Sequence, residues 1–143
     1  MGPLTAAGLR PDLPTAWLAE GLLLYLHPHE ADSLLTSVTA LSAPGSVLAG
    51  EYFNRRVRWE DVPDMLSEEE PIARVFLAAD RGGPLVEPVP WAAGNGWSAT
   101  QRDFVDVVAE LGRPVPALMA GTGPDALVLW LFHATFGRPR TAG

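Results

Sequence analysis

The chain has 143 residues, of which 48% are hydrophobic and 19% are charged, and its ten basic and seventeen acidic residues give a net charge of −7. This composition excludes intrinsic disorder, and it disfavours nucleic acid as a partner because no basic stripe is present to contact phosphates. There is no cysteine, and all ten basic residues are arginine. Disulfides, thiolate metal sites and Schiff-base lysines are therefore excluded.

The start of the chain, MGPLTA, has no basic region followed by an apolar one, so it does not resemble a secretory signal. The longest apolar stretch, residues 15–26, contains Glu20 and is shorter than the roughly 20 residues that span a bilayer. We expect a cytoplasmic protein with no membrane partner.

Strand, helix and strand follow one another in the first half of the chain. Residues 15–19 form a continuous apolar run, which predicts a strand buried on both faces. Residues 30–41 carry apolar side chains every three or four positions, with Pro28 suited to a first helical position, and residues 46–53 predict a second strand. This order is typical of a βαβ unit with two parallel strands.

The second half of the chain is less regular. Residues 72–77 are compatible with a helix, and residues 88–96 have the composition of a loop. Apolar spacing predicts a helix over residues 100–111. Residues 115–119 and 125–134 are interpreted as two strands of an antiparallel hairpin, joined by a Gly-rich turn.

Glu20 is the most informative residue, because a carboxylate inside an apolar run is costly to bury without a partner. It follows the first predicted strand, and α/β sheets bind ligands beyond the carboxyl ends of their strands. Gly21 would let a ligand approach the backbone. The alternative is a surface glutamate at a corner between strand and loop.

Other candidates depend on position. Glu51 and Tyr52 end the second strand at the same sheet edge, either lining the same cleft as Glu20 or serving as ordinary strand-end residues. Trp91 and Trp97 could wall an apolar pocket or fill the core. The run HPHEAD at residues 27–32 departs from metallo-hydrolase spacing and is better explained as a helix N-terminus, so no metal site is predicted.

Residues 14–26, PTAWLAEGLLLYL, resemble a stretch of the leucine carboxyl methyltransferase-like family, which uses S-adenosylmethionine. The similarity continues through LSAPGS at residues 41–46 and Glu51, and returns at residues 96–97 and 112–116. It implies the C-terminal portion of a Rossmann-like α/β sheet: a parallel βαβ unit, then a helix and an antiparallel terminal hairpin.

The resemblance also implies a cofactor site. Glu20 would contact the methionine part of S-adenosyl-L-methionine, with Gly21 and Leu22 close by. The reaction would transfer the methyl group to a carboxyl or hydroxyl oxygen of a small molecule or side chain. Position makes Tyr25, Glu51 and Tyr52 the candidates for binding this acceptor, and no general base is assigned.

The family's Gly-rich loop and its ribose-binding acid have no counterpart in this sequence. The resemblance therefore implies that residues 1–143 form a single partial methyltransferase domain without the N-terminal cofactor-binding half. The alternative function is that of a non-catalytic truncated homologue. Such a protein would use an exposed sheet edge to form a homo-oligomer or to bind a complementing chain.

Overall fold

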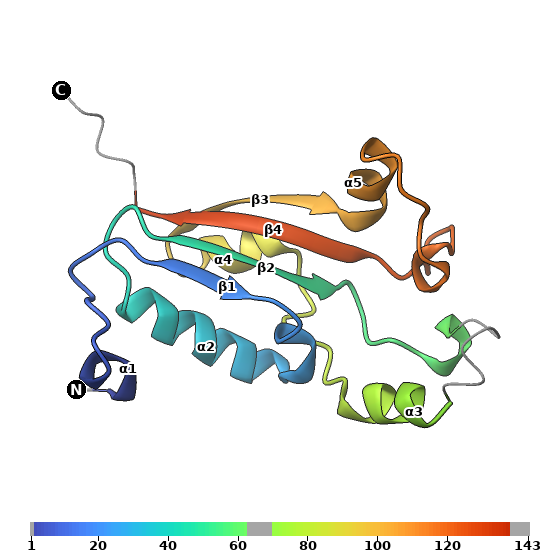
Figure 1. Cartoon of the computed structure of the whole chain (residues 1–143), viewed down its shortest axis with the longest axis horizontal. Helices are drawn as coiled ribbons and strands as arrows, with labels where there is room; N and C mark the ends of the chain where they lie inside the picture. The colour runs from blue at the N-terminus through green and yellow to red at the C-terminus, as the bar shows by residue number, and fades with distance from the viewer. Residues whose placement is uncertain (1, 63–69, 138–143) are drawn as a thin grey trace.

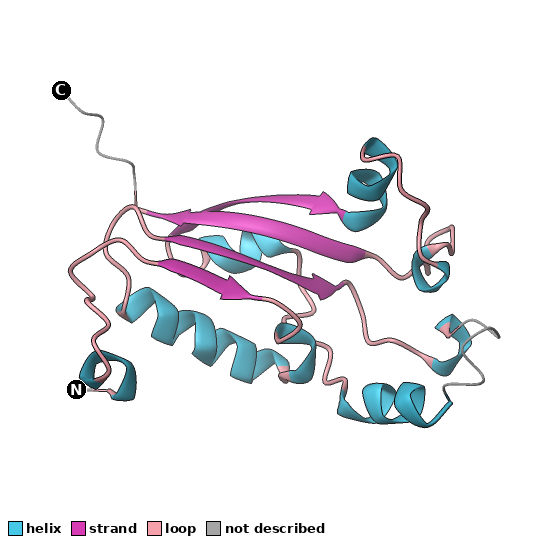
Figure 2. Cartoon of the chain, viewed as in Figure 1, coloured by secondary structure: helices cyan, strands magenta, loops and turns pink. Residues whose placement is uncertain are grey.

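A four-stranded mixed sheet lies at the centre of the computed structural model, which describes residues 2–62 and 70–137. The strand order is β1-β2-β4-β3, with β1 and β3 at the two edges (Figures 1 and 2). β1 and β2 are parallel, whereas β4 is antiparallel to both of its neighbours. The strands are β1 (Ala16–Ala19), β2 (Val47–Phe53), β3 (Trp97–Asp103) and β4 (Leu129–Phe136).

The predicted βαβ unit is confirmed. Helix α2 (Pro28–Ala40) joins β1 to β2 and begins with proline at its first position. The Glu30 carboxylate accepts a hydrogen bond from the backbone N–H of His27 at 2.8 Å, which caps the first turn. A turn at Gly45, with φ of +92°, then leads into β2.

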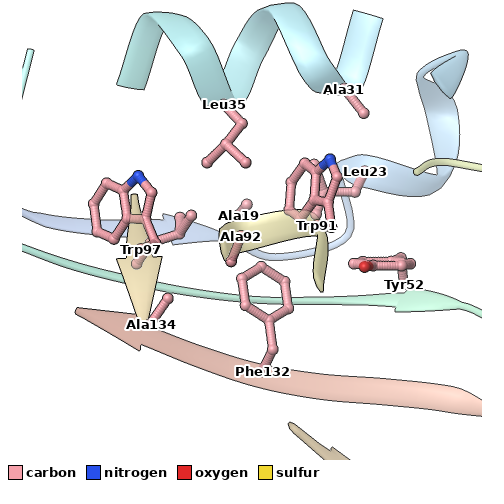
Figure 3. Packing of buried hydrophobic residues seen from close by; sticks show 11 residues of the cluster. Ala19, Leu23, Ala31, Leu35, Tyr52, Trp91, Ala92, Trp97, Phe132 and Ala134 are labelled. Atoms are coloured by element: carbon pink, nitrogen blue, oxygen red, sulfur yellow. The ribbon is translucent and has the colours of Figure 1, made fainter. Parts of the chain in front are cut away.

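The main core lies between the sheet and two helices, α2 and α4 (Pro88–Ala93). Trp91 of α4 donates its indole N–H to the Asp32 carboxylate of α2 at 2.9 Å, and Trp97 of β3 donates to the Thr39 hydroxyl at 2.8 Å. These bonds satisfy the polar end of each aromatic ring while its body is buried (Figure 3). The buried cluster comprises Ala19, Leu23, Ala31, Leu35, Leu48, Tyr52, Trp91, Ala92, Trp97, Phe132 and Ala134.

Shorter helices surround this unit. Helix α3 packs its partly buried Phe76 and Leu77 against a second small core formed by Phe53, Val57 and Leu127. The helices are α1 (Pro3–Ala6), α3 (Glu70–Ala79), α5 (Phe104–Glu110) and the 3₁₀ turns η1 (Leu23–Tyr25), η2 (Trp59–Asp61) and η4 (Ala117–Met119).

Several predictions for the second half were wrong. The strand that pairs with β4 is β3, not residues 115–119, which lie in a loop and η4. Pro114 and Pro116 explain this, because proline donates no hydrogen bond to a ladder. The predicted helix over 100–111 begins only at Phe104, and residues 88–93 are helical rather than loop.

The prediction that β1 is buried on both faces was also wrong. Trp17 and Ala19 face the core, but Ala16 and Leu18 are exposed. Successive strand residues point to opposite faces, and in the described part of the chain both core helices lie on the same face.

Candidate functional site

The two candidate glutamates lie beside each other at the carboxyl ends of the parallel strands. Ala19 of β1 is level with Gly50 of β2, so Glu20 and Glu51 follow at the same height. The backbone N–H of Gly21 donates a hydrogen bond to the Glu51 carboxylate. Gly21 has φ of +58°, a conformation that favours glycine. The structure thus brings together three of the predicted residues: Glu20 and Gly21 in the turn after β1, and Glu51 in β2.

The surroundings of Glu51 change the pKa of its carboxyl group. Partial burial raises the pKa of its carboxyl group, and the nearby charge of Glu20 raises it further. The hydrogen bond from Gly21 acts in the opposite direction and favours the ionised form. Within residues 2–62 and 70–137, neither glutamate forms an ion pair. The pair therefore offers negative charge to a cationic group of a ligand.

Leu22 and Tyr25 continue from this turn. The Leu22 side chain is exposed next to Gly21. Tyr25, in η1, contacts the edge of the Phe76 ring of α3, with the ring centroids 6.4 Å apart. Tyr25 and α3 together line an open apolar groove of about 440 Å³. Tyr25 is thus accessible to a ligand, but the groove that it lines does not include Glu20 or Glu51.

Tyr52 lies in the core and not in the cleft. Its side chain is fully buried, and its hydroxyl donates to the carbonyl of Val86 at 2.8 Å. Its ring makes edge-to-face contacts with the rings of Trp91 and Phe132 (Figure 3). It makes a similar contact with the ring of Trp130. Burial raises the pKa of the phenol far above its usual value, so this hydroxyl stays protonated.

The remaining candidate residues lie in the core or at the start of α2. Trp91 and Trp97 fill the core, which was the alternative interpretation of both. The rings of His27 and His29 stack at 5.7 Å at the start of α2. No group of three or more metal-binding side chains occurs among the residues that the structure describes. The same residues include no helix long and apolar enough to cross a membrane.

Two features escaped the sequence analysis. Asp80 is a buried carboxylate that accepts the backbone N–H groups of Val57 and Gly82, at 2.7 and 2.8 Å. Nothing in the local pattern distinguishes it from a surface aspartate after a helix. The apolar side chains of Ile72 and Val75 on α3 are strongly exposed beside Tyr25. Their three-residue spacing is a signal that could have found them.

The fold defines the class: an α/β protein with a mixed four-stranded sheet, whose candidate site residues lie beyond the carboxyl ends of its parallel strands. The leucine carboxyl methyltransferase family model matches residues 1–39, which include Glu20, Gly21, Leu22 and Tyr25. This segment is therefore similar to the leucine carboxyl methyltransferase family, as its sequence predicts.

Provisionally named S-adenosyl-L-methionine-dependent methyltransferases are similar over most of this chain. One from Parafrankia sp. (strain EAN1pec) is 42% identical over 119 residues, which cover 82% of this chain and 37% of the relative. One from Mycolicibacterium gilvum (strain PYR-GCK) is 40% identical over 133 residues, covering 90% and 43%. The chain spans about two fifths of the length of these relatives.

Solved structures give a weaker likeness. Phosphoethanolamine N-methyltransferase 2 from Haemonchus contortus, in complex with S-adenosyl-L-methionine, aligns with a TM-score of 0.47 and 8% identity. The alignment covers 86% of this chain and 33% of that structure. A likeness of this size carries no argument about the site.

Proposed function

We propose that this chain forms part of an S-adenosyl-L-methionine-dependent methyltransferase that transfers a methyl group to a carboxyl or hydroxyl oxygen. One observation carries the proposal: the turn of Glu20 and Gly21 lies at the end of β1, is bonded to Glu51 of β2, and falls within the segment that matches the family model. On the family's architecture, the four described strands correspond to the C-terminal portion of its sheet.

The residues at this turn suit the cofactor. Glu20 is exposed, so its carboxylate can accept hydrogen bonds from the ammonium group of the methionine part. A Cβ atom built on Gly21 would have no heavy atom within 4 Å, which shows open space beside the backbone. The exposed Leu22 side chain can cover the apolar part of the same group.

S-Adenosyl-L-methionine, when bound, supplies an electrophilic methyl group for in-line displacement by a substrate oxygen. The contribution of this chain would be to position the reactants and exclude water. Glu20 would bind and orient the ammonium group. Glu51, held by the Gly21 N–H, would keep the turn in place and add negative charge beside it.

Tyr25 and Glu51 remain the candidates for contacting the acceptor. Tyr25 is exposed at an apolar groove, which suits an acceptor with an apolar body. Tyr52 was predicted for the same task, but its buried hydroxyl already donates to Val86. We propose that Tyr52 supports the site from the core.

Titration of the ¹⁵N-labelled chain with S-adenosylhomocysteine tests the cofactor site. We expect amide shifts at Gly21 and Leu22, with an affinity weaker than micromolar because only one strand end contributes contacts. Glu20→Gln removes the charge and should reduce the affinity about tenfold, the loss of one charge-assisted bond. Glu60→Gln, on an exposed 3₁₀ turn, should leave it unchanged.

Equal binding by the wild-type and Glu20→Gln chains, or shifts confined to residues away from β1 and β2, would contradict the cofactor site. The acceptor class needs a separate measurement with methyl-labelled cofactor. A label released by mild alkali identifies a carboxyl ester, whereas a stable label identifies an ether.

A further inference from the structure

A groove of about 480 Å³ opens at the carboxyl end of β3, between the start of α5 and the loop that leads into β4. β2 and β3 are both antiparallel to β4, so β1, β2 and β3 run in the same direction, as their arrows in Figure 1 show. The groove therefore lies at the same edge of the sheet as the Glu20 turn. It shares no lining residue with the groove of Tyr25, so it is a separate place for a ligand.

Half-buried apolar side chains line much of this groove. Phe104 and Val105 come from the first turn of α5, Val115 and Met119 from the loop, and Val128 from the residue before β4. Each of the five is only partly covered, so apolar surface remains in contact with solvent. A ligand with an apolar body would remove that surface from water.

Two carboxylates line the same groove. Asp103 occupies the N-cap position of α5 without capping it, and Asp106 follows three residues later, so both lie on one side of the first turn and both are exposed. In the part of the chain that the structure describes, neither side chain forms a hydrogen bond or an ion pair. Arg102, their neighbour in sequence, pairs with Glu110 instead. The groove is therefore complementary to a positively charged ligand.

The loop side of the groove is held in place by residues that follow β2. Asn54 donates its side-chain N–H to the carbonyl of Ala126 at 3.1 Å and accepts the backbone N–H of Val128 at 2.9 Å. Arg55 donates to the carbonyl of Asp125 at 2.9 Å. These bonds fix this side of the groove before any ligand arrives, which reduces the entropy lost on binding.

An apolar lining beside two available carboxylates matches one class of ligand. We propose that this groove binds an organic amine, with its ammonium group at Asp103 and Asp106 and its apolar body against Phe104 and Met119. An ammonium group donates three hydrogen bonds, so it can serve both carboxylates at once. A neutral ligand would leave the carboxylates unused, and an anionic ligand would be repelled.

Titration of the ¹⁵N-labelled chain with 2-phenylethylamine tests this site. We expect amide shifts at Val105 and Val128 and weaker binding of 2-phenylethanol, which has the same apolar body without the charge. Asp106→Asn should reduce the affinity for the amine about threefold, the effect of one exposed charge pair. Asp12→Asn is the matched control, since Asp12 is an exposed carboxylate that does not line the groove. Both aspartates are exposed, so neither variant should unfold.

Three results would overturn the proposal. They are equal affinities for the amine and the alcohol, equal affinities of the wild-type and Asp106→Asn chains for the amine, and shifts confined to Gly21 and Leu22, which would place the amine at the cofactor turn. Higher salt should weaken binding of the amine and leave that of the alcohol unchanged, because salt screens exposed charges. Amine binding requires no methyl transfer, so its failure would leave the proposed cofactor site untouched.

Discussion

Gly50 shows how one residue can determine the packing of the sheet. It lies in β2 between Ala19 of β1 and Phe132 of β4. A Cβ atom at this position would lie 2.9 Å from the Ala19 carbonyl oxygen and 3.0 Å from the Phe132 ring. The ring can therefore lie against the strand only because residue 50 has no side chain.

We expect Gly50→Ala to destabilise the protein by about 1–3 kcal/mol, the cost of overpacking a core that cannot yield at the backbone. Urea unfolding followed by circular dichroism measures the change. Gly94→Ala is the control, because Gly94 has φ of −58° and its Cβ would meet only ordinary contacts at 3.5 Å and beyond. Equal unfolding midpoints for the two variants would contradict this account.

At the scale of elements, Asp80 forms hydrogen bonds that hold the end of α3 against neighbouring segments. Its two carboxylate oxygens accept the N–H groups of Val57 and Gly82. The next N–H groups along the chain, those of Arg81 and Gly82, also donate to the Leu24 carbonyl in η1. These bonds hold α3 against the segment that carries Tyr25, so the groove between them depends on Asp80.

Asp80→Ala should lower the free energy of unfolding by about 2–4 kcal/mol, since two buried donors lose their acceptor. Asp80→Asn should cost less, because one oxygen remains. Asp12→Ala removes an exposed carboxylate that forms an ion pair with Arg10 and should be almost neutral. The idea fails if Asp80→Ala unfolds at the same urea concentration as Asp12→Ala.

The elements that the sequence predicted well are those with local signals. Helix α2 has a proline start and regular apolar spacing, and β1 and β2 are short apolar runs on either side of it. Strand β3 was missed because its sequence runs directly into α5, so the apolar residues of the helix dominated the pattern. The pairing of β3 with β4 depends on contacts distant in sequence, which periodicity does not report.

The sequence also predicted part of the candidate site. The position of Glu20 and Glu51 follows from the parallel pair, which the sequence indicated. Tyr52 is the neighbour of Glu51, and successive strand residues face opposite sides of the sheet. Sequence alone did not reveal that the side bearing Tyr52 is the core, because that depends on where α4 packs.

At the scale of the whole molecule, Glu51 links stability to pH. Its folded-state pKa lies above the ordinary value of 4.5, so the folded protein binds more protons than the unfolded chain between the two values. The contribution of Glu51 to stability should therefore fall as the pH rises through this window.

Glu51→Gln should flatten this fall and make the protein slightly more stable than wild type at neutral pH, by less than about 1 kcal/mol because the group is partly solvated. Urea unfolding, measured at intervals of about one pH unit from pH 4 to 7, gives the dependence of stability on pH. Glu110→Gln is the control variant. The hydrogen bond from Arg102 lowers the pKa of Glu110, so replacing Glu110 should not flatten the same fall. Parallel profiles for wild type and Glu51→Gln would show that Glu51 does not set the slope.

The position of β4 has a consequence for the order of folding. β4 is the last strand of the described chain, yet it lies between β2 and β3 and pairs with both. β2 ends at Phe53 and β4 begins at Leu129, so their pairing closes a long loop, which costs entropy before any contact compensates for it. During synthesis, β2 can pair with β1 early, but β3 has no partner in the described sheet until β4 leaves the ribosome. The four-stranded sheet can therefore be completed only after Phe136 has been made.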